Sequence, residues 1–476
     1  PLEVDEYKTA SEEFRLQYRY LDLRRPVMQE KLILRHRVVQ ALREYLNSQQ
    51  FLEIETPLLI RHTPEGARDF VVPSRLHPGK FYSLPQSPQL YKQLLMIAGL
   101  DRYYQIARAL RDEDLRTDRQ PEHTQLDLEM SFVDEEDIFQ LTEQLLVHLF
   151  KTVLGKSLKV PFPRLKYDDC LEKYGIDKPD IRFGLELRTV TDIVKESDFQ
   201  IIKNVIAKGG IVKGITVEKG GTFTRTQLES YIALAQQLGA SGLVWMKVTK
   251  DSLESNVAKF FSSVVQKKLI AAMKAKPGDL LLMVADKPKQ VNEVMAKIRL
   301  RLGEELQLID KNVFQFCFIT DFPMFEWNEE EQKWDAMHHI FTMPKEEHIP
   351  LLDKDPGKVY ARLYDLVLNG TELYSGSVRT YKPELQQKLM EIIGMTPQQA
   401  KEKFGFLLEA YRYGAPIHAG FGMGIDRLVA LLAGINDIRE VIAFPKTKSM
   451  ENPMDSCPSE LDQKQLKELH IAVTGK

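Results

Sequence analysis

The sequence places charged and amide side chains along one face of a predicted hairpin. Arg111 ends a strand-like segment, and HTQLDLEMSFV (residues 123–133) alternates polar and apolar residues. This period of two puts Gln125, Asp127 and Glu129 on a common face. A solvated sheet face is the simplest interpretation of such alternation, but acidic and amide groups in register with a terminal arginine suit a binding floor for a charged ligand better.

Two further segments concentrate polar groups at predicted turns and helix starts. In TPEGARD, Glu65 adjoins Gly66, and a turn alone would explain this pair. In QSPQLYK, Ser87, Gln89 and Lys92 cluster in the first turn and a half of a predicted helix. Ser87 can be a plain N-cap and still be functional, because helix starts also favour anions.

The segments YDLVLNGTELYSGSVRT and HAGFGMGIDRL supply carboxylates and arginines. Asp365 and Glu372 could share a magnesium ion, since hard carboxylate oxygens bind it beside nucleotide phosphates. Arg379 and Arg427 stand in apolar, glycine-rich stretches, where a surface ion pair is the alternative for each. In a regular strand Glu372 and Arg379 face opposite sides, so either a bulge near Gly376 realigns them or one of the two has another role.

Several other chemistries find no support in the sequence. The glycine cluster at 209–221 contains neither GxxxxGK[ST] nor GxGxxG, so hairpin turns are expected there. His338 and His339 have no cysteine partners nearby, which favours a loop that presents one imidazole over a zinc site. KTKSM (446–450) is similar to a lysine-rich nucleotide-binding loop, but the early histidine motif that accompanies such a loop is missing. No elbow sequence supports a serine nucleophile.

The composition is that of a globular protein without membrane spans. The chain has 476 residues, and 65 Lys+Arg against 68 Asp+Glu give a net charge of -3, so two to four domains are expected. No apolar run approaches the roughly 18 residues that cross a bilayer. The three cysteines, Cys170, Cys317 and Cys457, are too widely spaced for a metal or disulfide framework, which indicates a reducing, cytoplasmic location. The near-neutral charge argues, on average, against a nucleic-acid partner.

These side chains need a scaffold of helices and strands that the sequence also indicates. A helix is predicted over residues 26–50, with Pro26 in its first turn, followed by a short strand in FLEIETP. Another helix should be capped by Ser87, with Pro88 at its first position, and should end at Gly99. The strands DRYYQIARAL and HTQLDLEMSFV should form a hairpin around DEDLRTDRQPE. Residues 178–311 have a strand–helix–strand pattern of their own, which indicates an α/β insertion.

Together these motifs carry a resemblance. ALRDED before a loop and strand resembles motif 2 of the class II aminoacyl-tRNA synthetases, GMGIDR resembles motif 3, and the helix leading into FLEIETP resembles motif 1. The longer strings YRYLDLRR, TPEGARDF, LPQSPQLYKQLLM, RDEDLRTDRQPEHTQLDLEMSF, DKPDIRFGLEL and VIAFPK resemble bacterial-type aspartyl-tRNA synthetase. They occur in order across essentially the whole chain, which is far more specific than any one motif.

The resemblance implies an α+β fold, with an antiparallel sheet flanked by helices and an inserted α/β domain. Residues 1–178 would form the first part of the catalytic domain with motifs 1 and 2, residues 179–310 the insertion, and residues 311–476 the second part with motif 3. The chain begins at the hinge that follows the family's N-terminal anticodon-binding domain, so we expect a fragment that lacks this domain. Motif 1 implies a homodimer.

The resemblance also implies a reaction. Such enzymes join L-aspartate to ATP, giving aspartyl-adenylate and pyrophosphate, and then transfer aspartate to the 3′ end of tRNA(Asp), with Mg²⁺ accompanying ATP. Because anion attacks anion, the protein must neutralise charge and align groups, and no covalent enzyme intermediate is required. The alternatives are an enzyme that also charges tRNA(Asn), a tRNA-independent aspartate-activating paralog, and an inactive synthetase core that only binds or regulates.

The resemblance assigns roles residue by residue. Arg111, Glu113 and Arg427 are expected to act in catalysis. Aspartate should contact Glu65, Ser87, Gln89, Lys92, Arg111, Gln125, Asp127, His338 and Arg379. ATP should contact Arg111, Asp112, Glu113, Gln120, His123, Glu372, Gly424, Ile425, Asp426 and Arg427, and Mg²⁺ should bind Asp365 and Glu372. The chain departs from the family where His123 replaces a phenylalanine, Ile340 a proline, and Tyr374 and Ser375 two glycines.

Overall fold

The computed structural model describes residues 10–62, 67–250 and 252–474. The chain forms two compact units. The first consists of Pro1–Phe162, Phe322–Asp365 and Leu373–Lys476, and the second of Pro163–Asp321 and Leu366–Glu372. The boundaries that the resemblance implies for the two catalytic parts and for the insertion remain a prediction.

The first unit is built around neighbouring strands of a mainly antiparallel eight-stranded sheet, in the order β1-β4-β5-β17-β16. Its long hairpin pairs Gln105 with Asp127 across β4 and β5, and β17 then pairs Gly422 with Asp127. β1 runs parallel to its neighbour β4. The predicted hairpin and the predicted α+β class are therefore confirmed. The strands are β1 (Leu52–Glu53), β4 (Arg102–Leu110), β5 (Glu122–Ser131), β16 (Thr371–Val378) and β17 (His418–Gly424).

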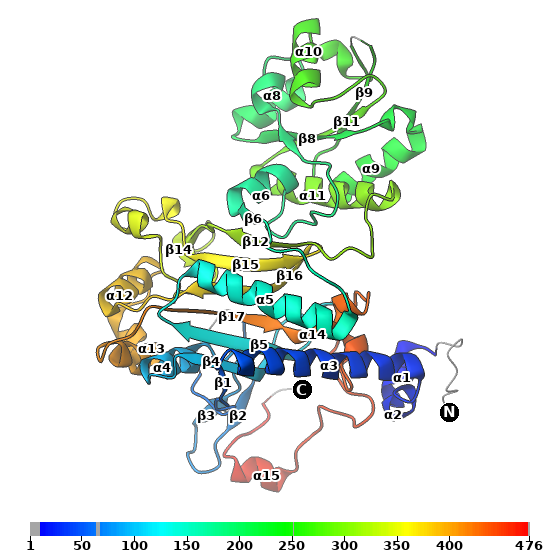
Figure 1. The fold of residues 1–476 in the computed structure, drawn as a ribbon. Helices are drawn as coiled ribbons and strands as arrows, with labels where there is room; N and C mark the ends of the chain where they lie inside the picture. Colours follow the sequence, from blue (N-terminus) through cyan, green and yellow to red (C-terminus); the bar gives the residue numbers. More distant parts are fainter. Residues whose placement is uncertain (1–9, 63–66, 251, 475–476) are drawn as a thin grey trace. The chain divides into compact units, whose positions relative to one another are not determined.

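Helices cover this sheet. α3 and α5 run along each other, and α14 packs against α3 and β5 (Figure 1). α4 packs against β4, β5 and α13. Their bounds are α3 (Pro26–Ser48), α4 (Gln89–Ile97), α5 (Glu135–Leu154), α12 (Pro383–Ile392), α13 (Pro397–Tyr411) and α14 (Ile425–Leu432). Shorter elements are α1 (Glu12–Gln17), α2 (Arg19–Asp22), β2 (Val71–Pro73), β3 (Phe81–Ser83), β13 (Phe325–Asn328), β14 (Lys333–Ala336), β15 (Leu363–Leu368) and α15 (Gln463–Glu468).

The second unit has its own sheet, in the order β10-β9-β11-β8-β7. Apolar residues of β8, β11, α9 and α11 form a buried core beside it, including Ile215, Leu282 and Ile298. The strand–helix–strand pattern expected from the sequence is found as β8, α9 and β9. The elements are β7 (Arg188–Thr189), β8 (Ile211–Val217), β9 (Val244–Val248), β10 (Leu253–Glu254), β11 (Leu280–Asp286), α6 (Tyr167–Tyr174), α7 (Thr191–Val194), α8 (Gln200–Ala207), α9 (Arg225–Gln237), α10 (Ser263–Ala272) and α11 (Pro288–Glu305), together with the parallel pair β6 (Arg164–Lys166) and β12 (Phe316–Thr320).

Local chemistry shifts some boundaries from those predicted. α4 starts one residue later than expected, with Pro88 rather than Ser87 at the N-cap, although Ser87 Oγ accepts from the Gln89 amide at 3.4 Å. The alternation of β5 ends before Phe132, whose φ of 60° turns the chain and leaves the ring 75% exposed. In the part of the chain described, no helix is long and apolar enough to cross a membrane.

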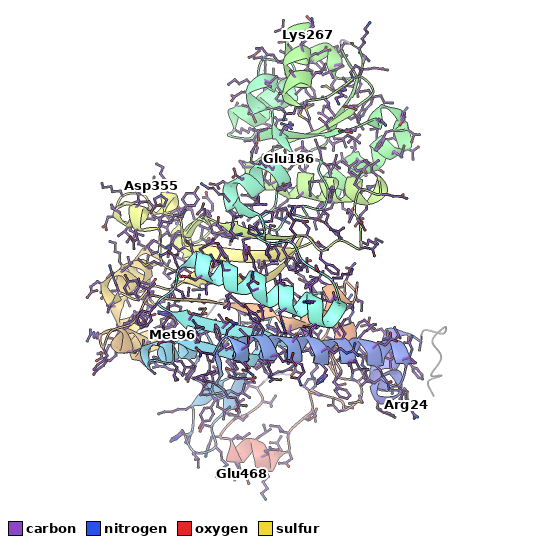
Figure 2. The ribbon with its side chains drawn as sticks, in the orientation of Figure 1. Arg24, Met96, Glu186, Lys267, Asp355 and Glu468 are labelled. Atoms are coloured by element: carbon purple, nitrogen blue, oxygen red, sulfur yellow. The ribbon has the colours of Figure 1, made fainter. Side chains whose placement is uncertain are left out.

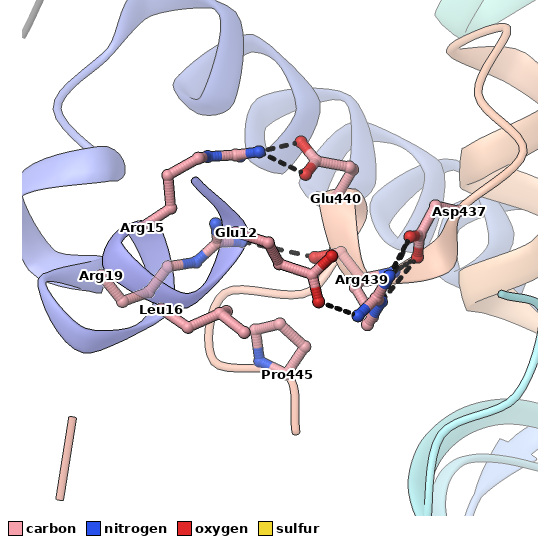
Figure 3. Close-up of a pocket in the computed structure, with 8 residues that line it drawn as sticks. All are labelled: Glu12, Arg15, Leu16, Arg19, Asp437, Arg439, Glu440 and Pro445. Carbon is pink, nitrogen blue, oxygen red and sulfur yellow. Dashed lines mark hydrogen bonds and ion pairs between the residues drawn. The ribbon is translucent and has the colours of Figure 1, made fainter. Parts of the chain in front are cut away.

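The charged groups of α1 meet the segment 437–445 around a small pocket (Figure 3). Arg15 binds Asp22 at 3.0 Å and Glu440 at 2.9 Å, and Lys31 also binds Glu440 at 2.9 Å. Burial alone would raise the pKa of Glu440, but the hydrogen bonds from Arg15 and Lys31 outweigh it and lower the pKa to about 2. This cluster joins the start of the chain to the segment after α14.

Glu440 should therefore stabilise the protein against acid. Because its folded pKa is depressed, the contribution is complete above about pH 4.5 and is lost as the pH falls towards 2. Glu440→Gln should lower the free energy of unfolding at pH 7 by about 1–3 kcal/mol, and should flatten the loss between pH 5 and 2. Urea unfolding at several pH values measures both effects. Glu409→Gln, which removes an exposed pair with Arg412, is the matched control and should change stability by less than about 0.5 kcal/mol; equal effects of the two variants would contradict the role of Glu440.

Candidate active site

Two cations and two carboxylates lie buried together on one face of the main sheet. Lys92 Nζ is 3.1 Å from Asp127 Oδ1 and 3.3 Å from Glu129 Oε2. The Arg379 guanidinium binds the same Glu129 carboxylate with both Nε and Nη2, at 2.8 and 3.2 Å. All four side chains are at most 2% exposed. The polar face of β5 is thus a buried floor, and the alternative of a solvated sheet face is wrong.

Strand register brings the four charges together. Asp127 and Glu129 lie opposite Gly422 and Gly420 of β17, which have no side chains to fill the space above the strand. A Cβ on Gly420 would collide with the Leu128 carbonyl and with the Glu129 carboxylate. Lys92 reaches the floor from α4 and donates a further hydrogen bond to the Phe421 carbonyl at 3.1 Å.

The ionisation of this cluster follows from burial and pairing. Burial raises the pKa of Asp127, and Lys92 only partly offsets the shift. For Glu129, burial also acts upward, but the charges of Arg379 and Lys92 outweigh it and hold the pKa below its ordinary value. Burial opposes the charge of Arg379, while Glu129 raises its pKa above the ordinary value. The cluster thus combines two basic side chains with two acidic ones, which offset each other's charge in their ordinary ionised forms.

Beside this cluster lie buried polar atoms that face no protein partner. Among the residues that the structure describes, Gln125 Oε1 and Asp127 Oδ2 accept no hydrogen bond, and Gln89 Nε2 donates none. A Cβ placed on Gly422 would be 3.3 Å from Asp127 Oδ1 and 3.6 Å from Gln125 Oε1, so both side chains lie over this glycine. Buried acceptors without partners are costly, and a ligand that donates, such as an ammonium group, would satisfy them.

The two adjacent histidines have different surroundings. His339 Nε2 lies 2.9 Å from Arg379 Nη1, and burial together with this cation lowers the pKa of His339 well below its ordinary value. His339 therefore accepts a hydrogen bond from Arg379 as a neutral imidazole. His338 is exposed and meets the ring of Phe322 edge-on at 5.2 Å. The sequence expectation placed His338 at the substrate; the imidazole that contacts Arg379 is His339.

A second group of site residues surrounds the loop between β4 and β5. Arg111 Nε donates to the Gln86 carbonyl at 3.4 Å. Arg119 binds Glu113 at 3.0 Å, and Asp118 binds Arg427 at 3.3 Å. Arg111, Glu113 and Arg427 are all partly exposed, so these groups stand where an incoming anion could exchange with the loop's own charges.

Other residues expected to contact ATP lie beside this loop and have closer contacts within the protein. The Gln120 side chain is 3% exposed, accepts from the Lys446 amide at 2.8 Å and donates to the Lys446 carbonyl at 3.2 Å. Asp112 pairs through its backbone with Arg68. Burial, aided by the charges of Arg111 and Arg427, lowers the pKa of His123 to about 4, although Asp426 acts against the shift. His123 is therefore a neutral ring at pH 7, which suits stacking on a base.

Comparison with known proteins decides the family. Residues 11–448 match the family described as tRNA synthetases class II (D, K and N). The chain is 52% identical over 474 residues to the aspartate–tRNA(Asp/Asn) ligase of Rubrobacter xylanophilus (strain DSM 9941 / JCM 11954 / NBRC 16129 / PRD-1), covering 99% of this chain and 79% of that protein. It is 51% identical to the enzyme of the same name from Aquifex aeolicus (strain VF5), covering 99% and 80%. The chain belongs to the class II tRNA synthetases.

The fold comparison agrees with this membership. Asparaginyl-tRNA synthetase from Pyrococcus horikoshii, solved with asparaginyl-adenylate, superposes with a TM-score of 0.52 at 19% identity, covering 92% of this chain and 73% of that one. Aspartyl-tRNA synthetase from Entamoeba histolytica gives a TM-score of 0.50 at 20% identity, covering 94% and 65%. At these identities the likeness shows the class II fold alone, while the full-length relatives confirm the resemblance to the bacterial-type enzyme.

In this synthetase the first turn of α14 is buried and held by partners within the protein. Gly424 is the N-cap of the helix and Ile425, its first residue, is fully buried. Asp426 is 2% exposed and binds Arg35 and the Thr124 amide, the latter at 2.8 Å. Gly424, Ile425 and Asp426 were all expected to contact ATP. Both carboxylate oxygens of Asp426 already have partners within the protein.

The carboxylates expected to hold magnesium belong to different units. Asp365 is 3% exposed in the first unit, whereas Glu372 lies in the second, 3.7 Å from Lys178. The ladder between β16 and β17 is regular from Tyr374 to Val378, so it contains no bulge near Gly376. Of the two alternatives for Glu372 and Arg379, this favours the one in which one of the two residues has another role. No group of three or more His, Cys, Asp or Glu side chains in the described part of the chain could enclose a metal ion. Carboxylate oxygens nevertheless suit Mg²⁺, which usually takes one or two of them plus substrate phosphates.

Some site residues lie outside this description or were missed from the sequence. Glu65 was expected at the aspartate site and falls outside the described residues. Glu129 and His339 were not among the expected ligand contacts, yet both bind Arg379 directly. The parity of β5 already placed Glu129 beside Asp127, so the alternation was the available signal. For His339 the sequence offered only a choice between two neighbours.

Proposed function

We propose that the chain is an aspartate–tRNA ligase, which activates L-aspartate with ATP and then transfers it to the 3′ end of tRNA(Asp). The main observation behind this proposal is the buried polar face of β5, where hydrogen-bond acceptors without partners lie next to the buried cations Lys92 and Arg379. Gln125 Oε1 and Asp127 Oδ2 suit the substrate ammonium. Arg379 and Lys92 suit its side-chain carboxylate, because a guanidinium fork matches a carboxylate and leaves an amide poorly paired.

Activation then needs charge neutralisation rather than a nucleophile of the enzyme. Arg111 would bridge the substrate carboxylate and the α-phosphate. Arg427 would release its ion pair with Asp118 and bind the γ-phosphate end of ATP instead. Glu113, Gln120 and His123 would contact ATP, with the neutral His123 ring stacked on adenine. In this way attacking and leaving oxygens are aligned in a site of fixed positive charge. Mg²⁺ bound with ATP would supply additional neutralisation of the phosphates, and Asp365 of the first unit would be one of the carboxylates that hold it.

A second candidate is an enzyme that charges both tRNA(Asp) and tRNA(Asn). The relatives at about 50% identity are named for both tRNAs, which favours this breadth. Aminoacylation of the two purified tRNAs separates the candidates, since product on tRNA(Asp) alone would reject the broader one.

The proposed homodimer is supported by exposed apolar side chains, and the proposed cytoplasmic location by the state of the cysteines. Large apolar side chains are exposed on and around β1 to β3, namely Leu52, Leu58, Leu59, Val71, Leu76 and Phe81, each at least 50% exposed. Contiguous exposed apolar residues mark interaction sites, so this region would form the homodimer interface near motif 1. The cysteines of the described chain are free thiols, in keeping with a cytoplasmic enzyme.

Amino-acid-dependent ATP–pyrophosphate exchange tests the function directly. With all twenty amino acids offered singly, exchange should require aspartate and Mg²⁺. Because the floor would leave the amide of asparagine unmatched, asparagine should give no more than background. Exchange with asparagine or lysine in place of aspartate would overturn the assignment.

A further inference from the structure

A partly buried ion pair includes Asp426, one of the residues expected to contact ATP. It joins Arg35 of α3 to Asp426 in the first turn of α14, and the aspartate is 2% exposed. The second carboxylate oxygen of Asp426 accepts the Thr124 amide of β5 at 2.8 Å. Both oxygens of this carboxylate are thus used to tie one helix start to a helix and a strand.

Arg35 itself connects more than this pair. Its Nη2 donates to Thr124 Oγ1 at 2.9 Å, and its Nη1 also reaches the Val441 carbonyl at 3.4 Å. Thr124 Oγ1 in turn accepts from Arg108 of β4 at 3.1 Å. One guanidinium therefore holds β5, the start of α14 and the segment beyond α14 in a fixed relation.

The residues tied in this way either belong to the set expected to contact ATP or are next to it in the sequence. Thr124 stands between His123 and Gln125, and Asp426 directly precedes Arg427. Since side chains alternate along a strand, Thr124 points to the face opposite that of His123 and Gln125. The ion pair thus supports the ATP side from behind the sheet.

We propose that Arg35 is a positioning residue for ATP: by fixing Asp426 and Thr124 it sets the positions of Arg427 and His123. This inference rests on the proposed function, because it concerns the same adenylate-forming site. The aspartate side of the floor depends on Lys92, Glu129 and Arg379, which Arg35 does not contact. Loss of Arg35 should therefore affect ATP far more than aspartate.

Pyrophosphate exchange of Arg35→Met, measured separately against ATP and against aspartate, tests this separation. The methionine keeps an apolar stem without the guanidinium. We expect kcat/KM for ATP to fall about 10- to 100-fold, the effect of a misplacement near 1 Å, while KM for aspartate changes less than about threefold. Arg35→Lys should recover part of the loss, because one ammonium can pair with Asp426 without also holding Thr124.

Two controls keep the result interpretable. Arg43→Met removes an arginine from the same helix, where it binds Glu53 at the surface, and should leave both kinetic constants unchanged. In a double-mutant cycle, Asp426→Asn should add little to Arg35→Met, since both remove one interaction. If Arg35→Met does not fold, as judged by thermal unfolding, the smaller ATP-selective loss in Arg35→Lys decides.

Parallel losses for ATP and aspartate, unchanged ATP kinetics, or an equal effect of Arg43→Met would overturn the proposal. The variants are assayed with the amino acid that supports exchange in the wild-type protein. If that amino acid is not aspartate, the proposed function is wrong. If the wild-type protein uses aspartate but the Arg35 variants show no ATP-selective loss, only the role of Arg35 is wrong.

Discussion

Arg379→Ala is expected to abolish aspartate-dependent pyrophosphate exchange while ATP still binds. The guanidinium binds both oxygens of Glu129 and contacts His339 at the floor, and it is the proposed partner of the substrate carboxylate. Losing a charged, buried donor that the ligand needs should lower kcat/KM for aspartate at least about 10³-fold. Exchange kinetics and calorimetric titration with ATP measure the two properties separately.

The variant also leaves the buried carboxylates of Asp127 and Glu129 to share Lys92 as their cation, which costs about 3–5 kcal/mol of stability. Arg379→Ala combined with Glu129→Gln removes one of these carboxylates and should recover much of the stability without recovering activity. A double variant that regains exchange would mean that the single variant failed through folding. Unchanged aspartate affinity in a folded Arg379→Ala protein would exclude Arg379 as the selector.

Lys92→Met should have the second large effect. Lys92 lies within 3.3 Å of two buried carboxylates, and without it one positive charge faces two negative ones. We expect a loss of about 3–5 kcal/mol in the free energy of unfolding and a fall of at least about 10³-fold in aspartate activation, both measured at pH 7.

The pH dependence of this variant has a definite sign. Lys92 holds down the pKa of Asp127, which burial already raises. Without the cation that pKa rises further, the carboxyl becomes protonated and no longer accepts from an ammonium, and any residual activity should increase with pH. Lys92→Met with Glu129→Gln restores charge balance and should recover stability but not aspartate binding. A residual activity that falls with rising pH would contradict this account of Asp127.

Much of the fold followed from local sequence pattern. The 102–131 hairpin was predictable because a strand-like segment and a second, alternating one flank a polar loop, and α3 was predictable because Pro26 marks its first turn. Its buried face was less predictable: Val38 and Ala41 are buried, whereas Leu32 and Val39 are only partly so. Which part of an apolar stripe is covered depends on packing with α5, and local periodicity does not contain that information.

The sequence predicted which residue types gather at the site, but it did not predict which of their side chains contact one another. Residue types and parity placed Gln125, Asp127 and Glu129 on one face, as found. The partners come from distant segments: Glu129 and Arg379 are 250 positions apart, and Asp426 and Arg35 are 391 apart. Spacing within a motif carries no signal for such contacts, so the roles of Arg35 and His339 emerge only from the folded chain.

The balance of charge in the floor has a consequence for how substrate arrives. Lys92 and Arg379 are cancelled at close range by Asp127 and Glu129, so this part of the protein projects little field into solution. Long-range steering needs an unbalanced potential. Aspartate that binds at the proposed site would therefore be selected on contact rather than drawn in from a distance, and we expect its association rate to depend only weakly on ionic strength.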